Sequence, residues 1–175
     1  MKKMMLKFTL TVLCFFTFNV AVTAAIKENP LIQEIIREKE NTDKEKLTVK
    51  TETRHIDGGA EEINYYYNGN ELKKIVDIFD TSNVVDADFT EETEYYLKNG
   101  KVYFIHIKEI YTKYDLESVT EDTVKEKKYY FDFKGKLVRY VDENGKIHEN
   151  DSEMKKAYED FKGSVSNKLK KYLKN

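Results

Sequence analysis

The sequence predicts an α+β domain: a mostly antiparallel β-meander sheet of about six to eight strands, with a short N-terminal helix and a long amphipathic C-terminal helix packed on one face. Two observations predict this fold. A tyrosine pair, a glycine turn and apolar residues recur in that order at 65–72, 95–102 and 129–137. An apolar stripe at helical spacing then runs through 151–173. Because glycine supplies the positive φ angles of tight turns and tyrosine favours strands, each repeated unit predicts one β-hairpin.

The first 25 residues have the three-part layout of a secretory signal peptide. Three lysines precede an apolar stretch at 8–22, and small residues end the segment. The stretch contains polar residues and is shorter than the ~20 apolar residues that span a bilayer, so no stable membrane span is expected after cleavage at Ala24 or Ala25. We therefore expect export, to the periplasm or as a secreted protein. The only cysteine, Cys14, lies in this segment, so the mature chain should form no disulfide of its own.

Charge and length limit the function class of the remaining chain. Without residues 1–25 it holds 27 basic and 32 acidic residues, a formal charge of −5. A nucleic-acid binder normally carries a basic patch, so no nucleic-acid partner is expected. Aromatic residues make up 13% of the sequence, which is enough to build a core. We predict a short helix and charged linker at 26–46 and a single α+β domain at 47–175, since about 150 residues fit one domain.

The N-terminal helix is predicted from its capping residues. Asn29 can cap the first turn, and Pro30 suits the first helical position. The run at 37–46 is almost entirely charged or polar, which predicts a frayed helix end followed by a linker. The apolar residues that share one side of the helix are Leu31, Ile32, Ile35 and Ile36.

From residue 47 the hydrophobic period changes to two, which is typical of strands. The segment 102–107 carries bulky residues on both alternating faces, with Tyr103 and Phe104 expected on opposite sides, so its strand should be central. Polar residues predict two longer connections, an acidic loop at 80–88 and a polar segment at 114–122. The predicted strands are 47–55, a segment that includes 63–67, 72–79, 90–97, 101–111, 123–133 and 136–141.

The C-terminal helix at 151–173 is the clearest prediction. Asn150 can cap it, with Glu153 three residues later. Acidic residues concentrate in its first half and lysines in its last turns, the distribution that the helix dipole favours. We expect this helix to cover one face of the sheet, and its lysine-rich end could alternatively contact anionic lipid. Its apolar stripe comprises Met154, Ala157, Tyr158, Phe161, Val165, Leu169, Tyr172 and Leu173.

Tyrosines are the main candidates for ligand contact. Adjacent strand residues point to opposite faces, so each tyrosine pair places one ring on each side of the sheet. The rings could form cross-strand ladders, or they could bind a sugar or hydrophobic ligand on the face that the helix leaves open. The predicted contact residues are Tyr66, Tyr96, Tyr103 and Tyr130. The first hypothesis is a non-catalytic binding protein for a partner protein or an apolar small-molecule ligand, without a cofactor.

Two other functions stay open. The three histidines form no metal-ligand pair and the sequence has no nucleophile motif, so no catalytic or metal-binding residue is assigned. A small hydrolase could still use His106 with a nearby carboxylate such as Asp77 or Asp88. A structural envelope component could instead oligomerise through sheet edges. The acidic segment from Asp77 to Glu92 could bind calcium or form a solvated connection.

One hairpin has a recognisable sequence. The segment 129–145 reads YYFDFKGKLVRYVDENG and resembles one YD repeat of bacterial cell-surface and toxin-shell proteins. The turns at Gly69 and Gly100 are similar to the hairpins of MORN-like repeat proteins. Each unit covers about twenty residues, and longer insertions at 80–90 and 113–122 interrupt the array. The resemblance implies hairpins, and no function is carried over from it.

Overall fold

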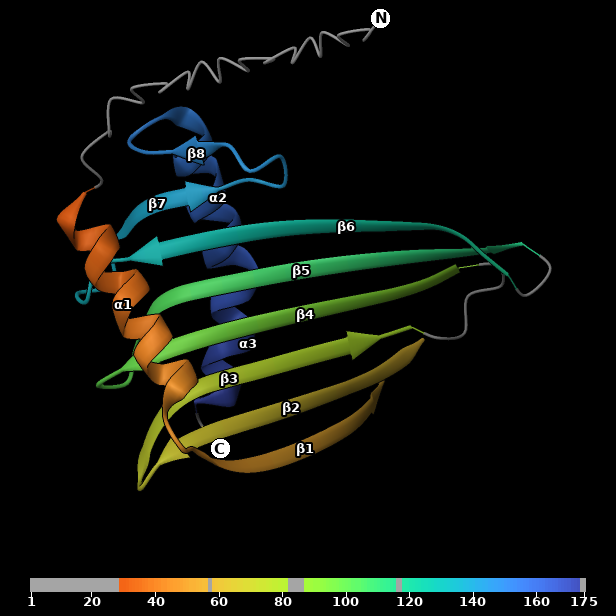
Figure 1. The fold of residues 1–175 in the computed structure, drawn as a ribbon, viewed down its shortest axis with the longest axis horizontal. Coiled ribbons are helices and arrows are strands. Elements are labelled where there is room, and N and C mark those ends of the chain that lie inside the picture. The colour runs from red at the N-terminus through yellow and green to blue at the C-terminus, as the bar shows by residue number, and fades with distance from the viewer. Residues whose placement is uncertain (1–28, 57, 82–86, 116–117, 174–175) are drawn as a thin grey trace, which may run out of the picture.

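A single eight-stranded antiparallel sheet forms the centre of the molecule, and its strands lie in sequence order (Figure 1). The structure is a computed structural model that describes residues 29–56, 58–81, 87–115 and 118–173. The predicted antiparallel meander is therefore confirmed. The elements are α1 (Pro30–Lys44), β1 (Thr48–Ile56), β2 (Gly59–Asn68), β3 (Glu71–Asp80), β4 (Ala87–Lys98), β5 (Lys101–Asp115), β6 (Ser118–Phe131), β7 (Leu137–Val141), β8 (Ile147–His148), α2 (Ser152–Gly163) and α3 (Val165–Tyr172).

Tight turns join the long central strands. Between β4 and β5, Asn99 and Gly100 adopt φ angles of +53° and +71°, the left-handed pair that a two-residue hairpin turn requires. At the other end of β5 the strand continues to Asp115, and β6 begins at Ser118. The polar connection predicted for 114–122 was therefore wrong, because its described residues, 114–115 and 118–122, belong to the two strands.

Helix α1 crosses one face of the sheet near one end of the strands (Figure 1). It begins after the predicted cap Asn29 and continues to Lys44, so the charged run at 37–46 is helical for most of its length instead of frayed. Thr42 accounts for this difference, since it is buried and its hydroxyl lies 3.2 Å from the Tyr103 hydroxyl. Docking on the sheet thus stabilises a helix end that its own sequence leaves weak.

The predicted C-terminal helix is present but bent into two parts, α2 and α3, which lie behind the other face of the sheet in Figure 1. Ser164 separates them, with φ −110° and ψ −68°. Its hydroxyl donates a hydrogen bond to the Asp160 carbonyl at 3.0 Å, an interaction that commonly bends helices. Among the described helices, none is long and apolar enough to cross a bilayer.

The cap of α2 differs from the predicted one by a single residue. Asp151 Oδ1 accepts a hydrogen bond from the Met154 amide at 2.8 Å, so Asp151 is the N-cap. Asn150, the predicted cap, has a φ of +59° and turns the chain into the helix instead. Asparagine tolerates this left-handed conformation better than most residues.

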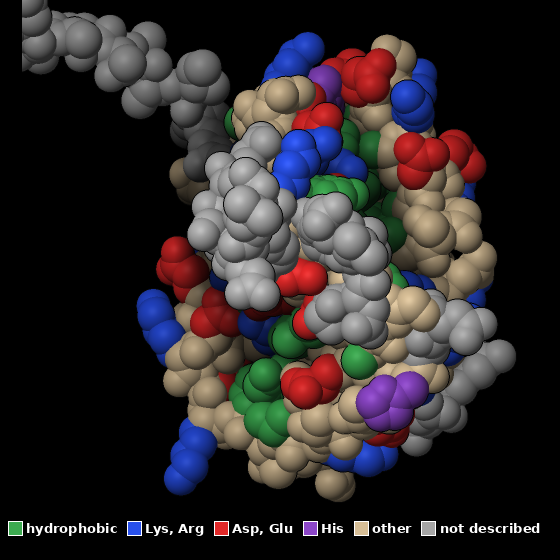
Figure 2. Space-filling view, turned by 90° about the vertical axis from the view of Figure 1, so that its right-hand side faces the viewer, with side chains coloured by type: hydrophobic (Ala, Val, Ile, Leu, Met, Phe, Trp, Pro, Cys, Tyr) green, Lys and Arg blue, Asp and Glu red, His purple; other side chains and the backbone are tan. Residues whose placement is uncertain are grey.

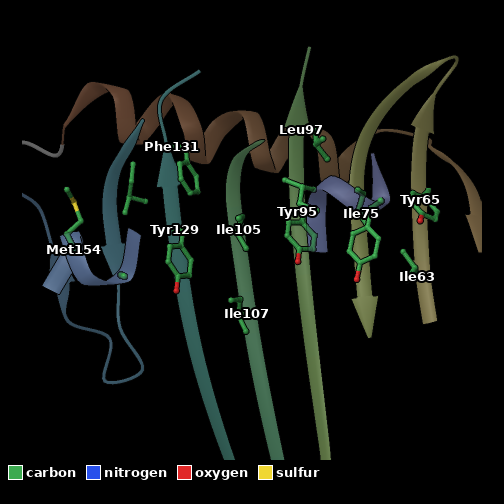
Figure 3. Packing of buried hydrophobic residues seen from close by; sticks show 14 residues of the cluster. Ile63, Tyr65, Ile75, Tyr95, Leu97, Ile105, Ile107, Tyr129, Phe131 and Met154 are labelled. Atoms are coloured by element: carbon green, nitrogen blue, oxygen red, sulfur yellow. The ribbon is translucent and has the colours of Figure 1, made fainter. Parts of the chain in front are cut away.

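Each face of the sheet carries its own hydrophobic cluster. On one face, Ile32 and Ile35 of α1 pack against Tyr96, Tyr103 and Phe104. On the other face, residues of α2 and α3 join a cluster built on six neighbouring strands, β2 to β7. Burying each of these large side chains contributes roughly 1.5–3 kcal/mol. The row across the strands consists of Tyr65, Ile75, Tyr95, Ile105 and Tyr129, as Figure 3 shows.

A β-bulge at Tyr103 widens the cluster beneath α1. Tyr96 pairs with Phe104, whereas the next residue of β4, Leu97, pairs with Val102, so Tyr103 has no partner in the register. The extra residue places Tyr103 and Phe104 in the same cluster. The strict alternation predicted for these two residues was therefore wrong.

Candidate functional site

A cleft lies between the sheet and the bend of the C-terminal helix, with a volume of about 600 Å³. Side chains of β3 to β6 form its floor, and α2 and α3 form its roof. Viewed from the far ends of the long strands, hydrophobic side chains lie recessed among charged side chains of both signs (Figure 2). The apolar part of the lining includes Phe79, Phe89, Tyr95, Ile107, Tyr129 and Val165.

The strand period and the helix bend together produce this cleft. Alternate residues of the central strands point toward α2 and α3, and the register places Thr93 beside Ile107 on the floor. Above them, the helix changes direction at Ser164, where the lining residues Ser164 and Ala157 have small side chains. Space remains because the bend and these small residues leave part of the floor uncovered.

Asp77 is the centre of a polar network beside the cleft. It is 1% exposed, and its Oδ2 accepts hydrogen bonds from the Tyr172 hydroxyl at 2.7 Å and from Lys168 Nζ at 3.1 Å. The Tyr172 hydroxyl also lies 3.2 Å from Glu61 Oε1, and Lys168 Nζ lies 3.5 Å from Glu91 Oε1. Asp77 Oδ1 has no hydrogen-bond partner among the described residues. The network ties α3 to β2, β3 and β4.

The protonation states of this network follow from burial and charge. Burial alone would lower the pKa of Lys168, but the carboxylates of Asp77, Glu91 and Glu61 outweigh it and raise that pKa. Burial raises the pKa of the Tyr172 hydroxyl, and the nearby Asp77 carboxylate raises it further. Lys168 is therefore charged and Tyr172 is neutral at physiological pH, and both act as donors to Asp77.

A second polar contact fixes α2. His148 of β8 is 2% exposed, and its Nε2 and Nδ1 lie 2.9 Å from Asp142 Oδ2 and 2.8 Å from Asp151 Oδ2. Its ring stacks on Tyr140, with centroids 5.8 Å apart. The two carboxylates raise the pKa of His148 above its ordinary value. Since Asp151 is also the N-cap of α2, a protonated His148 holds the start of the helix that forms one wall of the cleft.

The four tyrosines predicted to contact a ligand lie away from the cleft. Tyr96 and Tyr103 are buried in the cluster beneath α1, with ring centroids 6.3 Å apart. Tyr130 is half-buried at the edge of that cluster, where its ring lies 5.0 Å from that of Phe104. Tyr66 is half-buried, with Lys74 Nζ 6.0 Å from its ring centroid. The structure thus brings three of the four together, but α1 covers Tyr96 and Tyr103, which do not form an open platform.

Beyond α1, the same face carries a row of ion pairs. Lys74 Nζ contacts Glu94 Oε1 and donates a hydrogen bond to the Tyr96 hydroxyl at 2.8 Å. The Tyr96 hydroxyl in turn donates to Asp43 of α1 at 2.8 Å. Burial alone would raise the pKa of Glu94, but hydrogen bonds from His106 and Lys74 lower it to about 2. These charges therefore pair with one another across β3, β4 and β5.

The structure pairs His106 with carboxylates other than those expected. Its Nδ1 lies 3.4 Å from Glu94 Oε2, and its Nε2 lies 3.2 Å from Glu126 Oε2. Asp77 bonds to Tyr172 and Lys168 in the network on the opposite face. Asp88 is six residues from Glu94 along β4, a separation of about 20 Å. Neither of the two carboxylates proposed from the sequence therefore meets His106.

The acidic segment 77–92 is partly described. Asp77 already bonds to Lys168 and Tyr172, and Asp86 lies outside the described residues. Within the described part of the chain, no group of three or more His, Cys, Asp or Glu side chains could hold a metal ion. Calcium binding by the loop stays a prediction.

Sequence reasoning missed the charged residues of the cleft. Glu91 and Glu109 line its floor, and Lys168 lines its roof. A signal for the floor was present, because the period of two places Glu91 on the same face as Tyr95. Lys168 gave no such signal, since its position over the sheet depends on how α3 docks.

The size and the lining of the cleft suit a small molecule. Its volume is typical of small-molecule sites, and its aromatic floor with a charged rim suits an amphipathic molecule. Histidine and cysteine are absent from the described lining, and the Ser164 hydroxyl already donates to a carbonyl. No protein-family model matches the chain, and it has no significant match among curated proteins or solved structures.

Proposed function

We propose that this protein is a non-catalytic binding protein that holds a small amphipathic molecule between its sheet and its C-terminal helix. The cleft of about 600 Å³ carries this proposal. Its aromatic floor offers apolar contact, and its rim offers charged groups. The network around Asp77 supports the proposal, because it fixes α3 over the floor and so pre-organises the site.

Native mass spectrometry of the chain isolated gently from its own host tests this function. A small co-purifying mass is expected. A protein adduct would instead favour a partner protein or assembly through the edge strands β1 and β8, and a bare chain would contradict a stable ligand.

A cleft-filling variant locates the ligand. Val165 of α3 lines the cleft, so Val165→Trp should abolish the small adduct by occupying the space. Val124→Trp is the matched control, because Val124 lies outside the cleft on β6 and is 52% exposed. Equal retention of the adduct in both variants would place the ligand elsewhere. The free energy of unfolding of each variant shows whether a loss reflects the cleft or the fold.

We also propose that the protein is exported. The layout of residues 1–25 supports this, although these residues lie outside the described structure. The intact mass of the protein recovered from periplasm and medium tests it, with a chain starting at Ala25 or Ile26 as the expected product. Recovery of the full-length chain from the cytoplasm alone would contradict export.

A further inference from the structure

Two acidic side chains face each other on the floor of the cleft. Glu91 of β4 and Glu109 of β5 are directly opposite in the register, and both line the cleft. Among the strand pairs that the structure describes, theirs is the one that opposes two acidic residues. Like charges directly opposite one another destabilise a sheet. Departures from such local rules concentrate at functional sites.

The lysines of the inner cleft do not balance these acids. Lys127 Nζ lies 3.4 Å from Glu109 Oε1, and Lys168 is shared between Asp77 and Glu91. The lining as a whole has four acidic side chains and three lysines, which leaves one negative formal charge in excess; the acids are Glu91, Glu109, Glu153 and Asp160, and the lysines are Lys127, Lys156 and Lys168. Lys127 and Lys168 are already engaged, so an anionic ligand at the floor would have to break their pairs and meet Glu91 and Glu109.

We propose that the cleft selects an organic monocation, an amine attached to an apolar body. This inference rests on the proposed function. Directly opposed strand residues have Cβ atoms about 4.5–5.5 Å apart, so one ammonium group can reach both Glu91 and Glu109. The aromatic rings of Phe79, Phe89 and Tyr95 line the same space. Aromatic faces attract cations, and the rings also supply apolar contact for the rest of the molecule.

Three probes of equal length test the charge of the ligand. Octylamine, octanol and octanoate share an eight-carbon chain and differ in charge at neutral pH. Isothermal titration of the full chain should show octylamine binding at least about tenfold more tightly than octanol, with octanoate the weakest. Tighter binding of octanoate, or equal binding of octylamine and octanol, would overturn the inference while leaving the proposed cleft intact. If none of the three binds, the proposed function fails and the inference falls with it.

Variants that replace one acidic side chain by its neutral amide show which residues give the preference for a cation. Glu91→Gln and Glu109→Gln should each weaken octylamine binding about tenfold and leave octanol binding unchanged, because they remove charge and keep shape. Glu92→Gln is the matched control, since Glu92 is the next residue of β4 and points to the opposite face. An equal effect of Glu91→Gln and Glu92→Gln on octylamine would refute the assignment. Octanol binding reports whether each variant has kept its cleft.

Discussion

Both faces of the sheet carry buried aromatic rings, yet among the described residues the cleft of about 600 Å³ lies on one face alone. On the α1 face, Tyr96 and Tyr103 are sealed by an unbroken helix. On the other face the helix bends at Ser164, and Tyr95 and Tyr129 line an open space. Aromatic content therefore does not decide which face can hold a ligand. The shape of the covering helix decides it, because α1 packs directly on its rings, whereas the bend at Ser164 leaves space beside Tyr95 and Tyr129.

The largest predicted effects on stability concern Tyr95 and Tyr96, two adjacent residues whose rings lie on opposite faces of the sheet. Tyr95→Ala and Tyr96→Ala should each lower the free energy of unfolding by about 3–5 kcal/mol, since both side chains are almost fully buried. Only Tyr95→Ala should also reduce ligand binding in the folded fraction, because Tyr95 lines the cleft. Urea unfolding and ligand titration measure the two quantities.

Tyr66→Ala is the control for this pair, since Tyr66 is half-buried and lies outside the cleft. Its cost in stability should be smaller, and ligand binding should persist. Loss of binding in Tyr66→Ala and Tyr96→Ala with retention in Tyr95→Ala would move the site to the α1 face, as the sequence alone suggested.

A smaller effect distinguishes the hydroxyl groups that tie each helix to the sheet. Tyr172→Phe leaves Asp77 without its closest donor, whereas Tyr96→Phe removes a donor 2.8 Å from Asp43 Oδ1 and leaves Lys39 Nζ 2.6 Å from Asp43 Oδ2. Asp77 is 1% exposed, whereas the Asp43 side chain is 36% exposed and can bind water. We expect Tyr172→Phe to cost about 1.5–3 kcal/mol of unfolding free energy and Tyr96→Phe about 0.5–1.5 kcal/mol.

Tyr158→Phe is the matched control, because the Tyr158 hydroxyl makes no hydrogen bond to the described residues. Its change should stay within about 0.5 kcal/mol. Equal costs for Tyr172→Phe and Tyr96→Phe would show that burial of the acceptor does not set the strength of these contacts.

The smallest predicted effect depends on pH and belongs to the cleft face alone. The raised pKa of His148 gives a stabilisation that is complete below its ordinary pKa of 6.5 and is lost as pH rises through the raised value. The lowered pKa values of Asp142 and Asp151 give a stabilisation present above 3.8 and lost as pH falls through the lowered values. His148→Gln should therefore remove part of the alkaline loss of stability. His55→Gln, at an exposed position of β1, is the control for a change of histidine to glutamine. Identical urea midpoints for wild type and His148→Gln across pH about 5 to 9 would disprove the contact's role.

The sheet could be predicted from the sequence because its signals are local. A period of two and the Asn99-Gly100 turn depend on neighbouring residues, and the structure confirms the meander they predict. The bulge at Tyr103 could not be predicted, since one extra residue in a strand leaves no mark on composition. The bend at Ser164 and the position of Lys168 depend on how distant elements pack. The cleft depends on that bend, so the strand pattern that predicted its floor could not predict the cleft itself.

The sequential order of the strands also determines when the cleft can form. Every strand pairs with its neighbour in sequence, so each hairpin closes a short loop and the sheet can assemble quickly from the N-terminal end. The contacts of the C-terminal helix differ, because Tyr172 reaches Glu61 and Asp77 across 111 and 95 residues. These contacts close much longer loops than the hairpins do, so their entropic cost of closure is larger. We therefore expect the proposed cleft to form late in folding, when the C-terminal turn docks.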